Sequence, residues 1–238
     1  MILKEVTINA IWQAFLAALD LILNADPQLL EVITLTVRVS GSALFLSCLV
    51  GIPLGVFLGL ADFRGKRALQ IVIYTGMGLP PVVVGLVIYL MFSRSGPFGN
   101  LGWLFTPTAM ILAQAVLALP LAAGLTSTAV GEVSPEFVLQ IRSLGTTLRQ
   151  ERWTIIKEAR QGILTGAMAA LGRIIAEVGA AMLVGGNIAA RTRVLSTAIV
   201  LETRQGNFDL ALALGFILLG IAFISNAITL RLGLRWSG

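Results

Sequence analysis

Residues 131–160 read GEVSPEFVLQIRSLGTTLRQERWTIIKEAR, and they separate two long apolar parts of the chain. This stretch carries five basic and four acidic residues: Arg142, Arg149, Arg152, Lys157, Arg160, Glu132, Glu136, Glu151 and Glu158. The runs on either side are apolar enough for a lipid bilayer. A charged segment between two membrane-like regions predicts a loop that projects from the membrane and offers a docking surface in the cytoplasm.

The whole chain has the composition of a polytopic membrane protein. Its 238 residues are 57% hydrophobic and 12% charged, whereas a soluble domain carries about 25% charged residues. Charge-free runs long enough to cross a hydrocarbon core of about 30 Å as helix occupy residues 39–61, 68–93, 95–131 and 210–230. Residues 162–186 are equally apolar except for Arg173 and Glu177. We therefore predict an all-α membrane protein.

Five spanning helices are expected, at about residues 31–60, 68–92, 107–130, 161–186 and 210–230. Before them, residues 7–24 predict an N-terminal helix whose polar residues fall on one stripe: Asn9, Gln13, Asp20 and Asn24. Such an amphipathic helix lies in the membrane interface, and a sixth span is the alternative. The predicted domains are an interfacial helix, residues 1–30, and a transmembrane domain, residues 31–238, with its cytoplasmic loop at 131–160.

Basic residues are unequally divided between the two sides of the membrane. The side of the long loop holds ten: Arg64, Lys66, Arg67, Arg142, Arg149, Arg152, Lys157, Arg160, Arg231 and Arg235. The other side holds four, or five with Lys4: Arg94, Arg191, Arg193 and Arg204. The positive-inside rule predicts that the loop and the C-terminus of this multi-pass protein face the cytoplasm.

Several classes of chemistry are excluded by the residues that the chain lacks. It has no histidine, and its single Cys48 lies in an apolar run. Histidine proton relays, Ser-His-Asp triads and disulfides are therefore impossible. A glycine-rich phosphate loop ending in Lys-Ser/Thr is also missing, so this chain is not an ATPase. No catalytic residue and no metal site is predicted.

The long loop has the pattern of two short helices joined by a turn. Residues 134–137 read Ser-Pro-Glu-Phe, which combines an N-cap, a proline at the first helical position and an acid in the first turn. Phe137, Ile141 and Leu144 follow at helical spacing, Gly145 permits a turn, and a second helical piece comes after it. An ordinary solvated loop is the alternative interpretation.

The second expected span contains a break. Gly78, Pro80 and Pro81 lie near its middle, and tandem proline removes two backbone donors. Irregular backbone at this depth is tolerated only where protein or water satisfies it. These residues therefore predict either a simple kink or a pore-lining break.

Several parts of the sequence resemble the type I permeases of ATP-binding-cassette (ABC) importers. Residues 142–145, Arg-Ser-Leu-Gly, match the leucine-glycine turn of the family's cytoplasmic coupling loop; the Glu-Ala-Ala before it is replaced by residues 139–141, and the Leu-Pro after it is absent. Residues 172–188 resemble the molybdate/tungstate branch, and residues 78–86 are similar to its tungstate-type subfamily in particular. Segments within residues 192–215 are most similar to tungstate-type permeases, and the resemblance covers about residues 31–231.

The resemblance implies the permease subunit of an importer for tungstate or molybdate, in the cytoplasmic (inner) membrane of a prokaryote. It implies a homodimer, a cytoplasmic ABC ATPase dimer that binds ATP and Mg, and an extracytoplasmic substrate-binding protein; no cofactor is expected in this chain. The residues expected to couple to the ATPase are Phe137, Ile141, Leu144 and Gly145. Those expected at the translocation path or gate are Arg173, Glu177, Gly78, Pro80 and Pro81.

Arg173 and Glu177 are four residues apart, and a continuous helix would place them on one face. They predict either an ion pair that braces two helices or a gate in which Arg173 lies close to a passing oxyanion. For the protein as a whole, the alternative function is a stand-alone secondary transporter or channel for a small anion. A membrane enzyme is a third class, for which the chain lacks candidate residues.

Overall fold

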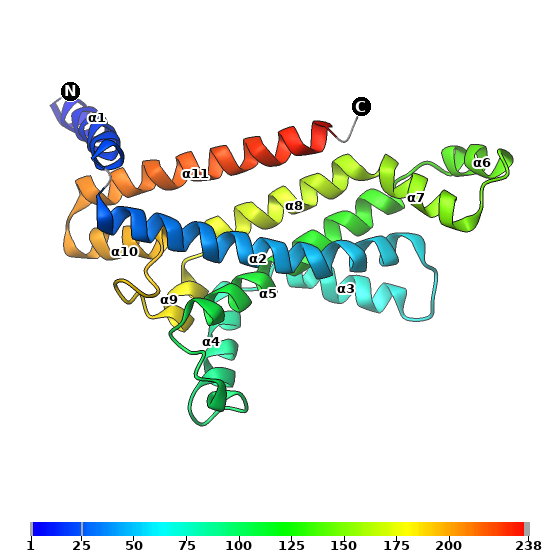
Figure 1. The fold of residues 1–238 in the computed structure, drawn as a ribbon, viewed down its shortest axis with the longest axis horizontal. Coiled ribbons are helices and arrows are strands. Elements are labelled where there is room, and N and C mark those ends of the chain that lie inside the picture. Colours follow the sequence, from blue (N-terminus) through cyan, green and yellow to red (C-terminus); the bar gives the residue numbers. More distant parts are fainter. Residues whose placement is uncertain (1, 25, 236–238) are drawn as a thin grey trace. The chain divides into compact units, whose positions relative to one another are not determined.

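The computed structural model describes the backbone of residues 2–24 and 26–235 and the side chains of residues 12–24 and 26–231. Within these ranges the chain is helical and contains no strand. Figure 1 follows the helices along the chain. They are α1 (Ile2–Leu23), α2 (Pro27–Leu60), α3 (Lys66–Met77), α4 (Pro81–Phe92), the 3-10 turn η1 (Gly99–Leu101), α5 (Pro107–Gly131), α6 (Pro135–Ser143), α7 (Leu148–Glu158), α8 (Arg160–Ile175), α9 (Gly179–Gly185), α10 (Leu195–Gln205) and α11 (Phe208–Arg235).

The helices provide up to five membrane spans in the described part of the chain. Three helices, α2, α5 and α11, are each long and apolar enough to cross a membrane. Two pairs, α3 with α4 and α8 with α9, pass the same test together, and a short break interrupts each pair. The all-α, multi-pass fold class predicted from the sequence is confirmed, with two of its five spans broken.

The fourth predicted span is interrupted, and the prediction of one helix over residues 161–186 is wrong. Helix α8 ends at Ile175, and α9 starts only after a short break. The backbone at this break finds partners among side chains. The Glu177 carboxylate accepts the N–H of Ala180 at 2.9 Å, and the Ser196 hydroxyl donates to the carbonyl of Glu177 at 3.1 Å. These bonds replace part of the helical ladder that the break removes.

By its internal contacts the chain divides into two compact units. Unit 1 consists of Met1–Ser42, Pro81–Gln114 and Ile175–Ser225. Unit 2 consists of Ala43–Pro80, Ala115–Ile174 and Asn226–Gly238. Helices α2, α5 and α11 each contribute residues to both units.

Helix α1 packs into the core of unit 1. Its Ala18 joins a buried cluster with Leu195 and Ala213, and Phe15 meets the ring of Phe216 edge-on, with the ring centroids 5.7 Å apart. Asn9, part of the predicted polar stripe, lies outside the residues whose side chains are described. That α1 lies in the membrane interface remains a prediction.

In unit 2, glycines bring α2 into close contact with α5. A Cβ added at Gly55 would collide with the Ala123 carbonyl oxygen and lie 2.6 Å from the Cβ of Thr126. A Cβ at Gly51, one turn earlier, would lie 2.9 Å from that of Ala122. Lipid tails are as apolar as the side chains, so there is no hydrophobic driving force for two helices to associate within a membrane. Close packing of small residues is therefore a main source of helix–helix association there.

Helix α8 approaches α5 in the same way. A Cβ added at Gly162 would collide with the Cβ of Ala129, and one at Gly166 would lie 3.1 Å from the Cβ of Leu125. The glycines at this spacing in α8 therefore pack within the chain.

Replacing Gly55 by alanine should destabilise the folded protein. Alanine would gain about 1 kcal/mol of helix propensity, but overpacking at a contact this close costs about 1–3 kcal/mol. Gly41 is the matched control on the same helix, because a Cβ added there has nothing within 4 Å. Thermal unfolding in detergent should show a lower midpoint for Gly55→Ala than for Gly41→Ala. Equal midpoints would contradict the α2–α5 packing described here.

Candidate functional site

The charged loop at residues 131–160 folds into two capped helices, α6 and α7, which we call the α6–α7 hairpin (residues 135–158). At the start of α6, the Ser134 hydroxyl accepts the N–H of Phe137 at 3.2 Å. At the start of α7, the N–H of Thr147 donates to the side chain of Gln150 at 2.8 Å, and the N–H of Gln150 donates back to the Thr147 hydroxyl at 3.4 Å. This reciprocal capping box defines where α7 begins, and the predicted helix start at Ser134 is confirmed.

A tight turn joins the two helices. Gly145 has φ +74°, a left-handed conformation that glycine adopts without steric cost. Its N–H donates to the carbonyl of Arg142 at 3.0 Å, and the hydroxyl of Thr146 donates to the carbonyl of Ile141 at 3.0 Å. These bonds satisfy carbonyls at the end of α6 that have no partner within the helix.

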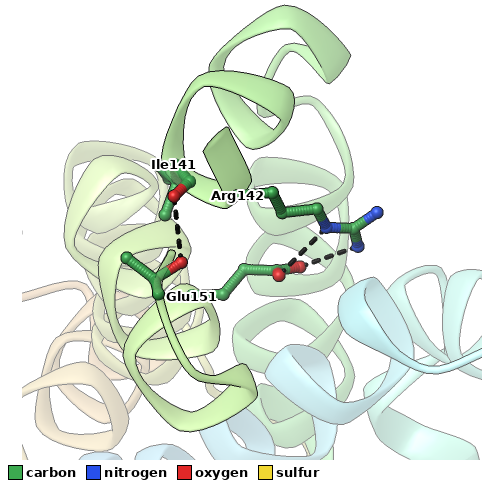
Figure 2. Close-up of polar contacts among 4 residues, drawn as sticks. Ile141, Arg142 and Glu151 are labelled. Carbon is green, nitrogen blue, oxygen red and sulfur yellow. Dashed lines mark hydrogen bonds and ion pairs between the residues drawn. The ribbon is translucent and has the colours of Figure 1, made fainter. Parts of the chain in front are cut away.

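A bidentate ion pair connects α6 to α7 across this turn. Figure 2 shows the guanidinium of Arg142 facing the carboxylate of Glu151. Nε of Arg142 donates to Oε2 of Glu151 at 3.0 Å, and Nη2 donates to Oε1 at 2.8 Å. The Glu151 side chain is 9% exposed and that of Arg142 is 59% exposed. A carboxylate with this little exposure needs such a partner.

The pair shifts the titration of both groups. The hydrogen bonds from Arg142 lower the pKa of the Glu151 carboxyl, against the smaller effect of its burial. The same bonds raise the pKa of Arg142. Because the folded-state pKa of Glu151 is lowered, the pair stabilises the hairpin at any pH above the ordinary carboxyl pKa of about 4.3. Its contribution is lost as the pH falls through the lowered value.

The predicted coupling residues occupy different environments in the hairpin. Leu144 is 81% exposed, Phe137 is half-buried, and Ile141 is 6% exposed and packs inward. Three further large apolar side chains are exposed and were missed from the sequence: Leu139, Leu148 and Trp153. Of the three apolar residues at helical spacing, Ile141 packs inward whereas Leu144 is exposed, so helical spacing alone did not identify the exposed apolar side chains.

The break at the tandem proline occurs where the sequence predicted it. Helix α3 ends at Met77 and α4 begins at Pro81, with Gly78 and Pro80 exposed between them. The carbonyl of Leu79 accepts a hydrogen bond from Nη2 of Arg173 at 2.8 Å. Arg173 thus satisfies a backbone acceptor in the broken segment, and this partner could not be predicted from helical spacing or local sequence.

Glu177 lies in the second break, so the continuous helix that would align it with Arg173 is absent. The Glu177 side chain is 5% exposed and caps the start of α9. The Arg173 side chain is half-buried, and its Nε has no hydrogen-bond partner among the described residues. Each residue therefore contacts backbone within its own unit, while its role at a gate remains a prediction.

Variants of Glu177 should separate its capping role from its charge. Glu177→Gln keeps a side-chain oxygen that can accept the N–H of Ala180, whereas Glu177→Ala removes it. Losing a capping acceptor costs about 0.5–2 kcal/mol. Thermal unfolding should therefore show Glu177→Gln close to the unmodified protein and Glu177→Ala clearly less stable. If both variants lose the same stability, the carboxylate acts through its charge and the capping interpretation fails.

Comparisons with known proteins agree with this architecture. The family described as "binding-protein-dependent transport system inner membrane component" matches residues 51–237. Two similar relatives are both described as tungstate uptake system permease protein TupB. The one from Peptoclostridium acidaminophilum is 41% identical and aligns over 91% of this chain and 95% of its own length. The one from Campylobacter jejuni is 40% identical and aligns over 98% of this chain and 97% of its own length.

A solved structure of the MetNI methionine ABC transporter, in inward-facing conformations, shares the fold. It superposes with a TM-score of 0.69 at 20% identity and covers 87% of this chain and 97% of its own. The family match extends over most of the chain and includes both broken spans and the α6–α7 hairpin. The chain is therefore a member of the family of binding-protein-dependent transport system inner membrane components.

Proposed function

We propose that this chain is the permease subunit of an ATP-driven oxyanion importer whose substrate is tungstate. The observation that carries this proposal is the similarity, over nearly the full length, to permeases of tungstate uptake systems. Molybdate has the same tetrahedral shape and the same charge, so it is the substrate most able to compete. The chain itself acts in transport, and ATP and Mg belong to a separate ATPase subunit.

The partners follow from what the chain exposes. The α6–α7 hairpin carries exposed apolar side chains on an otherwise charged cytoplasmic segment, including Leu144 and Leu148. Exposed apolar groups that gather on a polar background are typical of a protein-binding surface. We assign the ATPase to this surface. A second copy of the permease completes the translocation path, and an extracytoplasmic binding protein delivers the anion.

The two broken spans are the best candidates for the path through the membrane. Discontinuous helices expose backbone groups that can bind substrates at membrane depth. Arg173 adds a guanidinium beside one of these breaks, with one donor bound to the Leu79 carbonyl and its Nε unpartnered within the described residues. Because one of its donors is already bound to the backbone, the guanidinium can attract a dianion by its positive charge. It does not form a complete binding site, which would hold the anion too tightly for transport.

Transport in proteoliposomes tests the proposal. The permease should be reconstituted with its ATPase, supplied with the binding protein and radiolabelled tungstate, and compared with vesicles that lack the ATPase. We expect uptake that needs both ATP and the binding protein. Uptake that persists without the ATPase would identify a stand-alone transporter or channel instead. Uptake of molybdate at the same rate in competition would contradict the choice of tungstate as the substrate.

Gly145→Val should lower transport and substrate-stimulated ATP hydrolysis together while leaving the spanning helices folded. A Cβ at this position meets nothing within 4 Å, so the effect comes from the backbone alone. A β-branched residue at positive φ costs about 1–3 kcal/mol of strain, whereas asparagine adopts this conformation readily. Substrate-stimulated ATP hydrolysis should therefore fall in Gly145→Val and be largely kept in Gly145→Asn. Unchanged coupling in both variants would show that the turn does not transmit force.

A further inference from the structure

We propose that Arg142 and Glu151 are positioning residues for coupling, because their ion pair holds α6 on α7 so that a displacement of α6 is passed to α8 and to the end of α3. This inference rests on the proposed function, since it assumes that an ATPase acts on the hairpin. Every contact that it uses lies within unit 2.

The first link is the ion pair itself. It joins residues nine positions apart, on two helices separated by a glycine turn. Its two parallel hydrogen bonds constrain the direction of the guanidinium as well as its distance, which a single-point contact does not. Because the Glu151 side chain is only 9% exposed, water has little access to the carboxylate of the pair. Helix α6, which carries the exposed Leu139, is thereby connected to α7 by the ion pair as well as by the turn.

The second link is the junction of α7 and α8. Ala159 lies between the two helices with φ −74° and ψ −1°. Its N–H donates to the carbonyl of Ile155 at 2.9 Å, and its carbonyl accepts the N–H of Ile163 at 3.0 Å. Ala159 and Ile155 are buried in a cluster with Val130 of α5. Helix α7 thus passes into α8 without an intervening loop, and the junction is held by packing.

The third link is at the far end of α8. From Arg160 to Ile175 this helix extends about 24 Å at 1.5 Å per residue. Near its end, Arg173 binds the carbonyl of Leu79, in the broken segment after α3. A movement of α6 that reaches α8 therefore arrives at the backbone of a predicted translocation break. Of these three links, the ion pair is the one whose two charges can be exchanged between the partners, because the other two depend on apolar packing and on a backbone carbonyl.

A charge reversal tests the ion pair. Arg142→Glu, Glu151→Arg and the double variant would each be reconstituted with the ATPase and the binding protein. We expect ATPase co-elution in all three, because the exposed leucines remain. Tungstate-stimulated ATP hydrolysis should fall by about five-fold or more in each single variant, the lower end of typical coupling between sites. The double variant, which restores an ion pair of opposite direction, should recover most of the stimulation.

Arg64→Glu is the matched control, because Arg64 is exposed in the loop between α2 and α3, outside the hairpin, and the change in charge is identical. It should behave as the unmodified protein does. If a reversed single variant fails to fold, Arg142→Gln makes the same comparison without repulsion, with thermal unfolding measured alongside coupling.

Three results would overturn the inference: single variants that couple normally, a double variant that stays uncoupled, or an equal loss in Arg64→Glu. The proposed function fails in a different way, because the unmodified complex would then show no tungstate-stimulated hydrolysis at all.

Discussion

A backbone that crosses a hydrocarbon layer must satisfy its own polar groups, and this constraint governs the two places where the spans are broken. At the first break, the side chain of Arg173 supplies the donor for the carbonyl of Leu79. At the second, Glu177 accepts an N–H and Ser196 donates to a carbonyl. The charged side chains within the apolar spans therefore form hydrogen bonds with the backbone. These bonds determine where each side chain would lie when an anion passes.

The α6–α7 hairpin departs from the usual division between apolar interior and polar exterior. Its ion pair joins the two helices and leaves Glu151 with little exposure, while Leu144, Leu148 and Trp153 face outward. Side chains of this size stay exposed on a polar segment when another protein covers them. The hairpin thus combines an internal brace with an external contact surface, which is what a part that receives movement from a partner requires.

The fold could be predicted from the sequence wherever one residue type dictates the backbone. Tandem proline located the first break, Ser134 and Pro135 located the start of α6, and Gly145 located the turn. The second break has no proline. One of the two bonds that satisfy its backbone comes from Ser196, which is remote in sequence, so the break could not be predicted from a local pattern. The pair of Arg142 and Glu151 was missed because its members are nine residues apart on different helices, and helical spacing rules apply within a single helix.

The central claim, that the α6–α7 hairpin is the surface that meets the ATPase, is tested most directly by site-specific cross-linking. Leu144→Cys, in a Cys48→Ser background, would be treated with a bifunctional maleimide in membranes that contain the assembled transporter. The exposed Thr203→Cys, predicted to face the opposite side of the membrane, is the control. The account predicts a cross-link from position 144 to the ATPase subunit and none from position 203. A cross-link to the ATPase from position 203, with none from position 144, would contradict it.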